Sequence, residues 1–216
     1  MSYATPIVFV VDDDAAVRES LALLIECAGW QPETFASAEE FLACPRVLAP
    51  SCLVLDVTLP DISGLELQRR VAADRLDLPI VFISGYGDVP MTVQAMKAGA
   101  VEFLMKPLHG DVMLTVIEDA IERSHAALEH EAQMRTLRDR YASLSCRERQ
   151  VMALVVSGLL NKQVAGELDI SEITVKTHRG HAMRKMKARS LPDLVTMWAR
   201  LSLPRTCDPM SNRVCE

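Results

Sequence analysis

Four polar features each follow a short, apolar segment of the chain that has strand character. In chain order they are Asp12-Asp13-Asp14, Asp56, Ser84 and Lys106, the last followed by Pro107. Carboxylates offer Mg²⁺ the hard oxygens it prefers, and the metal would leave one aspartate able to attack a phosphoryl group. A hydroxyl and an ammonium at neighbouring positions would then hold the phosphoryl oxygens. These residue types therefore predict magnesium-assisted phosphoryl transfer.

The polar residues can meet only if the apolar segments are strands of one sheet. Continuous apolar runs indicate strands that are buried on both faces of a parallel sheet. The predicted strands are Ile7–Val11, Gln31–Phe35, Leu53–Leu55, Ile80–Ile83 and Val101–Leu104. The second is more polar than the others and is expected at an edge. Helical periodicity separates the strands, and two capping boxes, Ser37-x-x-Glu40 and Ser63-x-x-Glu66, open two of the helices.

This alternation predicts a doubly wound α/β domain, (βα)5, over residues 1–122. In such a sheet, sites form at the carboxyl ends of the strands, where all four polar features fall. Taken singly, an aspartate after a strand is usually a turn residue and Lys-Pro is usually a turn. Their occurrence at the ends of several strands of one sheet favours a functional site.

The motifs around these residues resemble the receiver domain of two-component response regulators. They are Val10-Val11-Asp12-Asp13-Asp14, Leu55-Asp56-Val57-Thr58-Leu59-Pro60, Ser84-Gly85 and Lys106-Pro107. Two further segments, Gly87–Met91 and Ala95–Ala100, are similar to the FixJ-like branch of the FixJ/NarL family. The resemblance implies that Asp56 accepts a phosphoryl group from a cognate sensor histidine kinase. The corresponding Lys-Pro peptide bond is often cis in this family, so the resemblance implies a cis bond between Lys106 and Pro107.

The resemblance assigns roles to the remaining residues. Asp12, Asp13, Asp56 and the Thr58 carbonyl would hold Mg²⁺. Ser84 would move toward the phosphoryl group, Lys106 would pair with it, and Phe103 would turn inward as Ser84 moves. A face around Val93, Lys97 and Phe103 would form a homodimer on phosphorylation. Ser84, Thr58 and Tyr86 depart from the residues usual in close relatives, so the lifetime of the acyl phosphate does not follow from the family pattern.

Residues 123–142 are polar and strongly helix-forming, which predicts a helical linker. Met134, Leu137, Tyr141 and Leu144 recur at 3-4-3 spacing, which is typical of a short coiled coil, although Leu128 breaks the phase. A solvated linker helix explains the composition equally well.

The segment 143–203 is entirely helical in pattern, and the tail 204–216 has no periodicity and is expected to be flexible. Ser145-x-x-Glu148 is a further capping box. Asn161–Leu168, a three-residue turn and Glu172–Met186 predict a helix-turn-helix within an all-α four-helix domain. The motifs resemble the LuxR-type output domain of the FixJ/NarL family. They are Leu144-Ser145-x-Arg147-Glu148-x-Gln150-Val151, Gly158-x-x-Asn161-Lys162 and Ile170-Ser171-x-x-Thr174-Val175-Lys176-Thr177-His178.

The family places the second helix of the motif in the major groove of double-stranded promoter DNA. By position, Lys176, Thr177 and Gly180 would face bases, and Arg179 would compensate for the missing side chain of Gly180. Phosphate contacts are expected from three further residues. They are Lys162, Thr174 and His178. RNA polymerase is the partner that a transcription regulator implies.

Charge and composition agree with this division. The segment 143–204 carries ten Lys and Arg residues against five Asp and Glu, whereas the whole chain has a net charge of −6. This asymmetry favours an acidic regulatory half and a half that meets a polyanion. Six cysteines without metal-ligand spacing, no apolar run of membrane-spanning length and no basic, apolar start predict a cytoplasmic protein with free thiols.

Two other functions are compatible with parts of the pattern. The helical half could bind a protein instead of DNA. A haloacid-dehalogenase-type phosphatase also uses a strand-end aspartate with Mg²⁺, but it usually needs a second aspartate two residues later, where this chain has Thr58. The phosphatase would also leave Asp12-Asp13 and the basic half unexplained. We therefore expect a regulator and not an enzyme.

Overall fold

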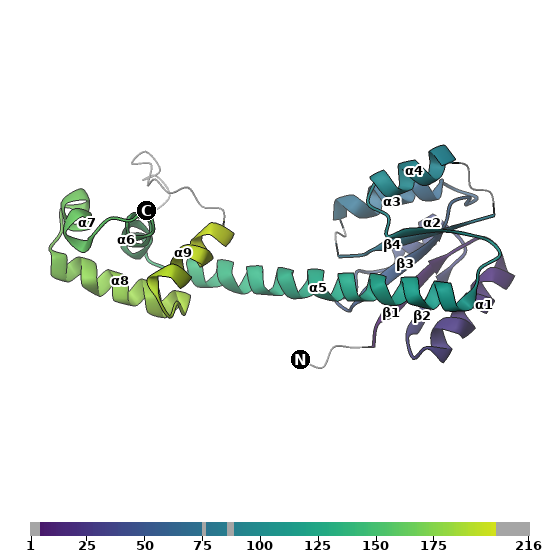
Figure 1. The fold of residues 1–216 in the computed structure, drawn as a ribbon, viewed down its shortest axis with the longest axis horizontal. Helices are drawn as coiled ribbons and strands as arrows, with labels where there is room; N and C mark the ends of the chain where they lie inside the picture. Colours follow the sequence, from purple (N-terminus) through teal and green to yellow (C-terminus); the bar gives the residue numbers. More distant parts are fainter. Residues whose placement is uncertain (1–4, 75–76, 86–88, 202–216) are drawn as a thin grey trace. The chain divides into compact units, whose positions relative to one another are not determined.

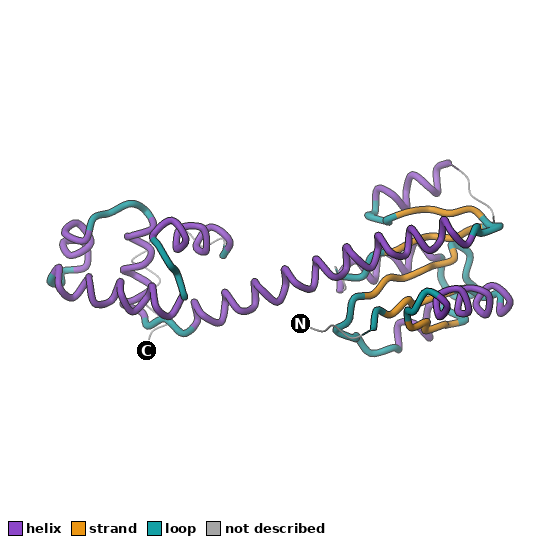
Figure 2. Tube along the Cα trace, turned by 60° about the horizontal axis from the view of Figure 1, so that its bottom comes forward, coloured by secondary structure: helices purple, strands orange, loops and turns teal. Residues whose placement is uncertain are grey.

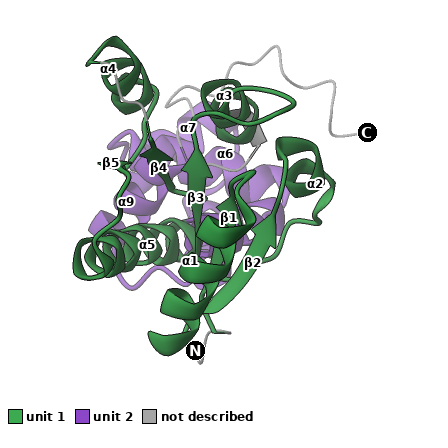
Figure 3. Cartoon of the chain, turned by 90° about the vertical axis from the view of Figure 1, so that its right-hand side faces the viewer, with its two compact units in different colours: residues 1–130 green, residues 131–216 purple. Residues whose placement is uncertain are grey.

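The computed structural model describes residues 5–74, 77–85 and 89–201 of the 216-residue chain. The chain divides into two compact units, Met1–His130 and Glu131–Glu216, which Figure 3 shows in different colours. Tyr86 and the predicted tail 204–216 lie outside the described residues. Within the described residues, no helix is both long and apolar enough to cross a membrane.

The first unit is built on a parallel sheet of five strands in the order β2-β1-β3-β4-β5. The strands are β1 Ile7–Val11, β2 Gln31–Phe35, β3 Ser51–Asp56, β4 Ile80–Ser84 and β5 Glu102–Met105. The polar strand β2 lies at one edge, as its composition predicts. The fold class predicted from the alternation of strands and helices is confirmed.

Helices cover both faces of this sheet (Figures 1 and 2). They are α1 Ala15–Cys27, α2 Ala38–Ala43, α3 Gly64–Asp74, α4 Val89–Lys97 and α5 Gly110–Ala142. Successive strand residues point to opposite faces, so Phe9 packs beneath α2, α3 and α4, while Val8 and Val10 pack against α1 and α5. Because both faces are covered, the central strands are apolar throughout, which is the pattern that identified them in the sequence.

At the amino-terminal ends of β3 and β4, the sheet is hydrogen-bonded to α5 through Ser124, which is fully buried. Its hydroxyl donates to the carbonyl oxygen of Asp77 at 2.7 Å and accepts from the backbone N–H of Ser51 at 3.0 Å. The hydroxyl therefore acts both as a donor and as an acceptor inside the protein. This contact joins the helix to the starts of β3 and β4, at the end of the sheet opposite to Asp56.

The segment predicted as a linker is the second part of α5, which is continuous from Gly110 to Ala142. Its apolar stripe is neither the coiled coil nor the solvated surface that the sequence left open. Leu137 is buried in the core of the second unit, with Met134 and Tyr141 packed against that core. The stripe therefore has a partner within its own chain.

The second unit also contains α6 Cys146–Val156, α7 Asn161–Leu168, α8 Glu172–Met186 and α9 Leu191–Arg200. Ser145 opens α6 with a complete capping box, because its hydroxyl accepts from the Glu148 backbone and the Glu148 carboxylate accepts from the Ser145 backbone. Trp198 lies in the core, edge-on to Tyr141 with ring centroids 6.1 Å apart. The predicted boundaries of α7 and α8 match those of the structure.

Candidate phosphoryl-transfer site and nucleic-acid interface

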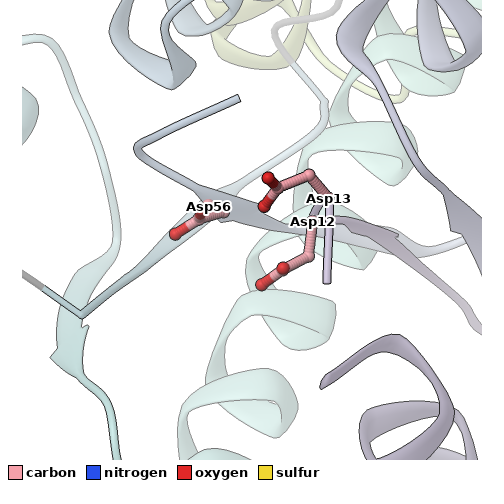
Figure 4. Close-up of side chains that lie close together, drawn as sticks. All are labelled: Asp12, Asp13 and Asp56. Atoms are coloured by element: carbon pink, nitrogen blue, oxygen red, sulfur yellow. The ribbon is translucent and has the colours of Figure 1, made fainter. Parts of the chain in front are cut away.

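Three carboxylates meet at the carboxyl edge of the sheet, and Figure 4 shows them together. Asp12 follows β1 and is fully buried, Asp56 is the last residue of β3, and Asp13 is exposed beside them. The neighbouring strands pair Val11 with Leu55, so the residues that follow are brought side by side. One carboxylate oxygen from each of the three aspartates lies within 4.8 Å of the others. This is the cluster that the sequence predicted.

Lys106 brings a positive charge to this cluster from the end of β5. Its Nζ atom lies 2.7 Å from Oδ2 of Asp12 and 3.5 Å from Oδ1 of Asp56. Its backbone N–H donates to the Ser84 carbonyl oxygen at 2.8 Å, which fixes the start of the Lys106 side chain. The Lys106–Pro107 peptide bond is cis, as the family resemblance implies.

Ser84 ends β4, the strand that pairs with β3 on one side and with β5 on the other. It is 1% exposed and is thus buried between the strand ends that carry Asp56 and Lys106. Thr58 lies two residues beyond Asp56 and is exposed. The turn between them is fixed by the Val57 backbone N–H, which donates to Ile83 at 3.2 Å.

The charges of the cluster perturb one another. Burial raises the pKa of Asp56, and the negative charges of Asp12 and Asp13 raise it further, while the Lys106 ammonium opposes the shift. Burial lowers the pKa of Lys106, but its hydrogen bond to Asp12 and the two carboxylate charges outweigh burial and raise it. Three carboxylates face one ammonium, so the cluster has an excess of negative charge. Its donors are hard oxygens, and both properties suit Mg²⁺.

Two residues that the sequence did not single out shape the site. The guanidinium of Arg18, in the first turn of α1, donates to the carbonyl oxygens of Asp12 and Asp13 at 2.7 and 3.0 Å. A Cβ atom on Gly64 would lie 2.3 Å from the carbonyl oxygen of Asp56. Nothing local in the sequence signals the Gly64 contact. The contact of Arg18 could have been predicted, because this arginine follows the aspartates by about one helical turn.

The three residues predicted for a dimer face differ in their exposure to solvent. Val93 and Lys97, on α4, are exposed, and Val93 is 44% exposed. Phe103, on β5, is half-buried and packs inward on Phe82, with ring centroids 6.1 Å apart. Exposed apolar side chains accompany Val93 on α4 and at the end of β5. They are Val89, Met96 and Met105.

In the second unit, α7 and α8 form the predicted helix-turn-helix. The Ser171 hydroxyl caps α8 by accepting from the Thr174 backbone at 3.1 Å, and it contacts the Thr174 hydroxyl at 2.8 Å. Asp169 ends α7 in the left-handed region, with φ of 50°. Val164 and Val175 bury the contact between the two helices. The geometry of the motif is therefore set by a cap, a turn and an apolar contact.

The predicted DNA-binding residues divide into two groups. Lys162, Lys176 and Thr177 are exposed, whereas Thr174, His178 and Arg179 are half-buried. Arg179 donates from Nη1 to Oδ1 of Asn161 at 3.0 Å, which places its guanidinium at the junction of α7 and α8.

The buried Glu148 joins α6 to α8. Its carboxylate lies 2.7 Å from Nζ of Lys185 and 3.6 Å from Nδ1 of His181. Burial alone would raise the pKa of Glu148, but the hydrogen bonds from Lys185 and from the Ser145 backbone outweigh it and lower the pKa. This ion pair fixes the second half of α8 to α6.

Comparison with known proteins identifies both domains. Residues 8–118 match the response regulator receiver domain, and residues 142–198 match the LuxR family of bacterial regulatory proteins. The chain is 48% identical to nodulation protein W of Bradyrhizobium diazoefficiens over 91% of this chain and 87% of that protein. It is 45% identical to response regulator protein TodT of Pseudomonas putida strain F1, over 93% and 88% of the two chains.

Among solved structures, the response regulator StyR superimposes with a TM-score of 0.82 and 46% identity, covering 91% of this chain and all of that one. Both the family resemblance and the fold inferred from the sequence are thereby confirmed. The chain belongs to the two-component response regulators that join a receiver domain to a LuxR-type DNA-binding domain, in their FixJ-like branch, and it is a transcriptional regulator.

Proposed function

We propose that Asp56 is the phosphoacceptor of this regulator. The observation that carries the proposal is the convergence of Asp12, Asp13 and Asp56 within 4.8 Å, with the Lys106 ammonium against them. Asp56 Oδ would attack the phosphorus of a phosphohistidine on a sensor kinase, so that a P–O bond forms as the P–N bond breaks. Lys106 and Ser84 would hold the phosphoryl oxygens.

The residues present suit Mg²⁺, and we propose that Asp12, Asp13, Asp56 and the Thr58 carbonyl would hold it. The ion would supply charge neutralisation at the phosphoryl oxygens. The chain itself contributes the placement of Asp56. The carboxylate is held at a strand end, largely shielded from water, beside a lysine that is bonded more closely to Asp12.

Phosphorylation is further proposed to promote receiver dimerisation through Val93, Lys97 and Phe103. The exposed apolar side chains near Val93 support this face, because apolar patches on a surface are typical of interaction sites. In the second unit, Lys176 and Thr177 are proposed to face bases. Phosphate contacts are proposed for Lys162, Thr174 and His178. Arg179, which is hydrogen-bonded to Asn161, would contact DNA in place of the missing side chain of Gly180. We further propose that the regulator contacts RNA polymerase and that it is located in the cytoplasm.

The phosphoacceptor is tested by incubating the full chain with acetyl phosphate and Mg²⁺ and measuring acid-labile phosphate on the protein. We expect uptake by the native chain and none by Asp56→Asn, because an amide cannot form the acyl phosphate. Asp119→Asn is the matched control, since Asp119 is an exposed residue of α5. Equal uptake by Asp56→Asn and the native chain would refute the assignment.

A further inference from the structure

The outward face of α8 carries four residues spaced four, three and four apart. They are Ile173, Thr177, Gly180 and Arg184, all exposed. This face lies opposite the buried residues Val175, Ala182 and Met186, because residues at i, i+4, i+7 and i+11 share one side of a helix. Ile173 is 76% exposed and so packs little of its side chain within the protein.

The first two turns of this face present apolar groups and no free hydrogen-bond donor. The Thr177 hydroxyl donates to the Ile173 carbonyl oxygen at 3.0 Å, so the methyl group is what the side chain offers outward. Gly180 has no side chain, and nothing lies within 4 Å of the place a Cβ would occupy. At the side of the face, Lys176 pairs with Glu172 at 3.2 Å.

The surroundings of this apolar face are basic. Lys176 and Arg184 are exposed on α8, Lys162 is exposed on α7, and Glu172 is the one acidic residue of α8. Cationic flanks suit the phosphates on either side of a DNA groove. In the major groove, the thymine C5-methyl is the group that an apolar side chain recognises.

We infer that α8 reads its operator through apolar contact of Ile173 and the Thr177 methyl with thymine C5-methyl groups. This inference rests on the proposed DNA binding by α8 and names the base feature that it recognises. Ile173, in the first turn of α8, is the specificity-determining residue, since the amino-terminal residues of a recognition helix contact base edges. The operator half-site therefore contains a thymine opposite Ile173.

The test begins with a duplex selected from random sequence by the full chain activated with beryllofluoride and Mg²⁺. Each thymine is then replaced by deoxyuridine, which removes the C5-methyl and keeps every hydrogen-bonding group. At the thymine opposite Ile173 in each half-site we expect about a fourfold loss of affinity, the loss that goes with one buried methyl group. In Ile173→Ala the same replacement should cost no further affinity.

Leu160→Ala is the matched control, because Leu160 is 71% exposed at the start of α7 and is not on α8. It should keep the full penalty for deoxyuridine. Unchanged affinity for every deoxyuridine duplex, or an equal penalty in Ile173→Ala and the native chain, would overturn the inference while leaving DNA binding intact. Absence of salt-sensitive duplex binding by the native chain would instead overturn the proposed DNA binding.

Discussion

Lys106 is shared unequally between two carboxylates. Its ammonium is closer to Asp12, at 2.7 Å, than to Asp56, at 3.5 Å. Asp12 is fully buried, and a buried carboxylate without a partner is costly, so the closer ion pair stabilises it. The longer distance leaves the Asp56 carboxylate less engaged by the ammonium, which would favour its proposed attack on a phosphoryl group. At this scale, the unequal sharing of one positive charge between two acids is what the proposed role of Asp56 as nucleophile requires.

Glu148 gives a stability prediction at the same scale. Its folded pKa is lowered below 4.5, so its contribution to stability is present above that pH and lost as pH falls through the folded pKa. We expect Glu148→Gln to lower the free energy of unfolding of the second unit by about 1–2 kcal/mol at neutral pH, because a charged hydrogen-bond partner of Lys185 is removed.

The difference between Glu148→Gln and the native residue should shrink as the pH is lowered from neutral through the folded pKa of Glu148, because glutamate is then itself protonated. Urea unfolding followed by the fluorescence of Trp198 measures this difference in the free energy of unfolding. Because the chain has two tryptophans, the measurement is made in a Trp30→Phe background. Glu167→Gln, an exposed change on α7, should have little effect. A difference that stays constant across this pH range would contradict the role assigned to the ion pair.

At the scale of elements, the start of α3 lies against the end of β3. The Gly64 backbone N–H donates to the Val57 carbonyl oxygen at 2.9 Å, and its Cα faces the Asp56 carbonyl. Only a residue without a side chain allows this approach. The helix therefore helps to set where Asp56 lies, although it contributes no group to the chemistry.

We predict that Gly64→Ala slows phosphate uptake from acetyl phosphate by about tenfold or more, because displacing a reacting group by a fraction of an ångström is costly. Crowding of the β3 backbone should also lower receiver stability by about 1–3 kcal/mol. Rates of uptake and urea unfolding followed by Trp30 fluorescence, in a Trp198→Phe background, measure the two effects.

The matched change Gly166→Ala is expected to leave both quantities unchanged. Gly166 lies within α7, and nothing lies within 4 Å of the place its Cβ would occupy. If Gly64→Ala took up phosphate at the native rate, the proposed positioning of Asp56 by α3 would be incorrect.

At the scale of the whole molecule, the proposal links phosphorylation to association of two chains. Val93→Arg would place a charge in the proposed interface, four residues from Lys97 on the same helix. We expect beryllofluoride-treated native chain to sediment as a dimer and the variant to associate at least about tenfold more weakly, because an unpaired charge in an interface is costly. Acid-labile phosphate uptake should be retained.

Val47→Arg is the comparison for this variant, since Val47 is 38% exposed in the loop between α2 and β3. It should dimerise as the native chain does. Equal association of both variants and the native chain would exclude the α4 face as the interface.

The sequence alone determined the order of strands and helices, the edge position of β2, the family and the cluster around Asp56. The family was recognised from the resemblance of its motifs. The other features depend on alternation and capping residues, which are local patterns, and on the rule that parallel strands end at one edge of a sheet. Residues at strand ends are placed by topology, so their meeting could be foreseen. The boundaries of α7 and α8 could be predicted because their caps and the turn between them are encoded in the neighbouring residues.

Only the tertiary structure decided which surfaces are covered. The stripe that contains Leu137 reads as a coiled coil or a solvated helix, and its burial in the second unit depends on residues far along the chain. The closeness of Gly64 to Asp56, the tie from Arg179 to Asn161 and the exposure of Ile173 are likewise non-local. A sequence pattern specifies that a side chain is apolar or charged, but its partner is set by packing between segments distant in the chain.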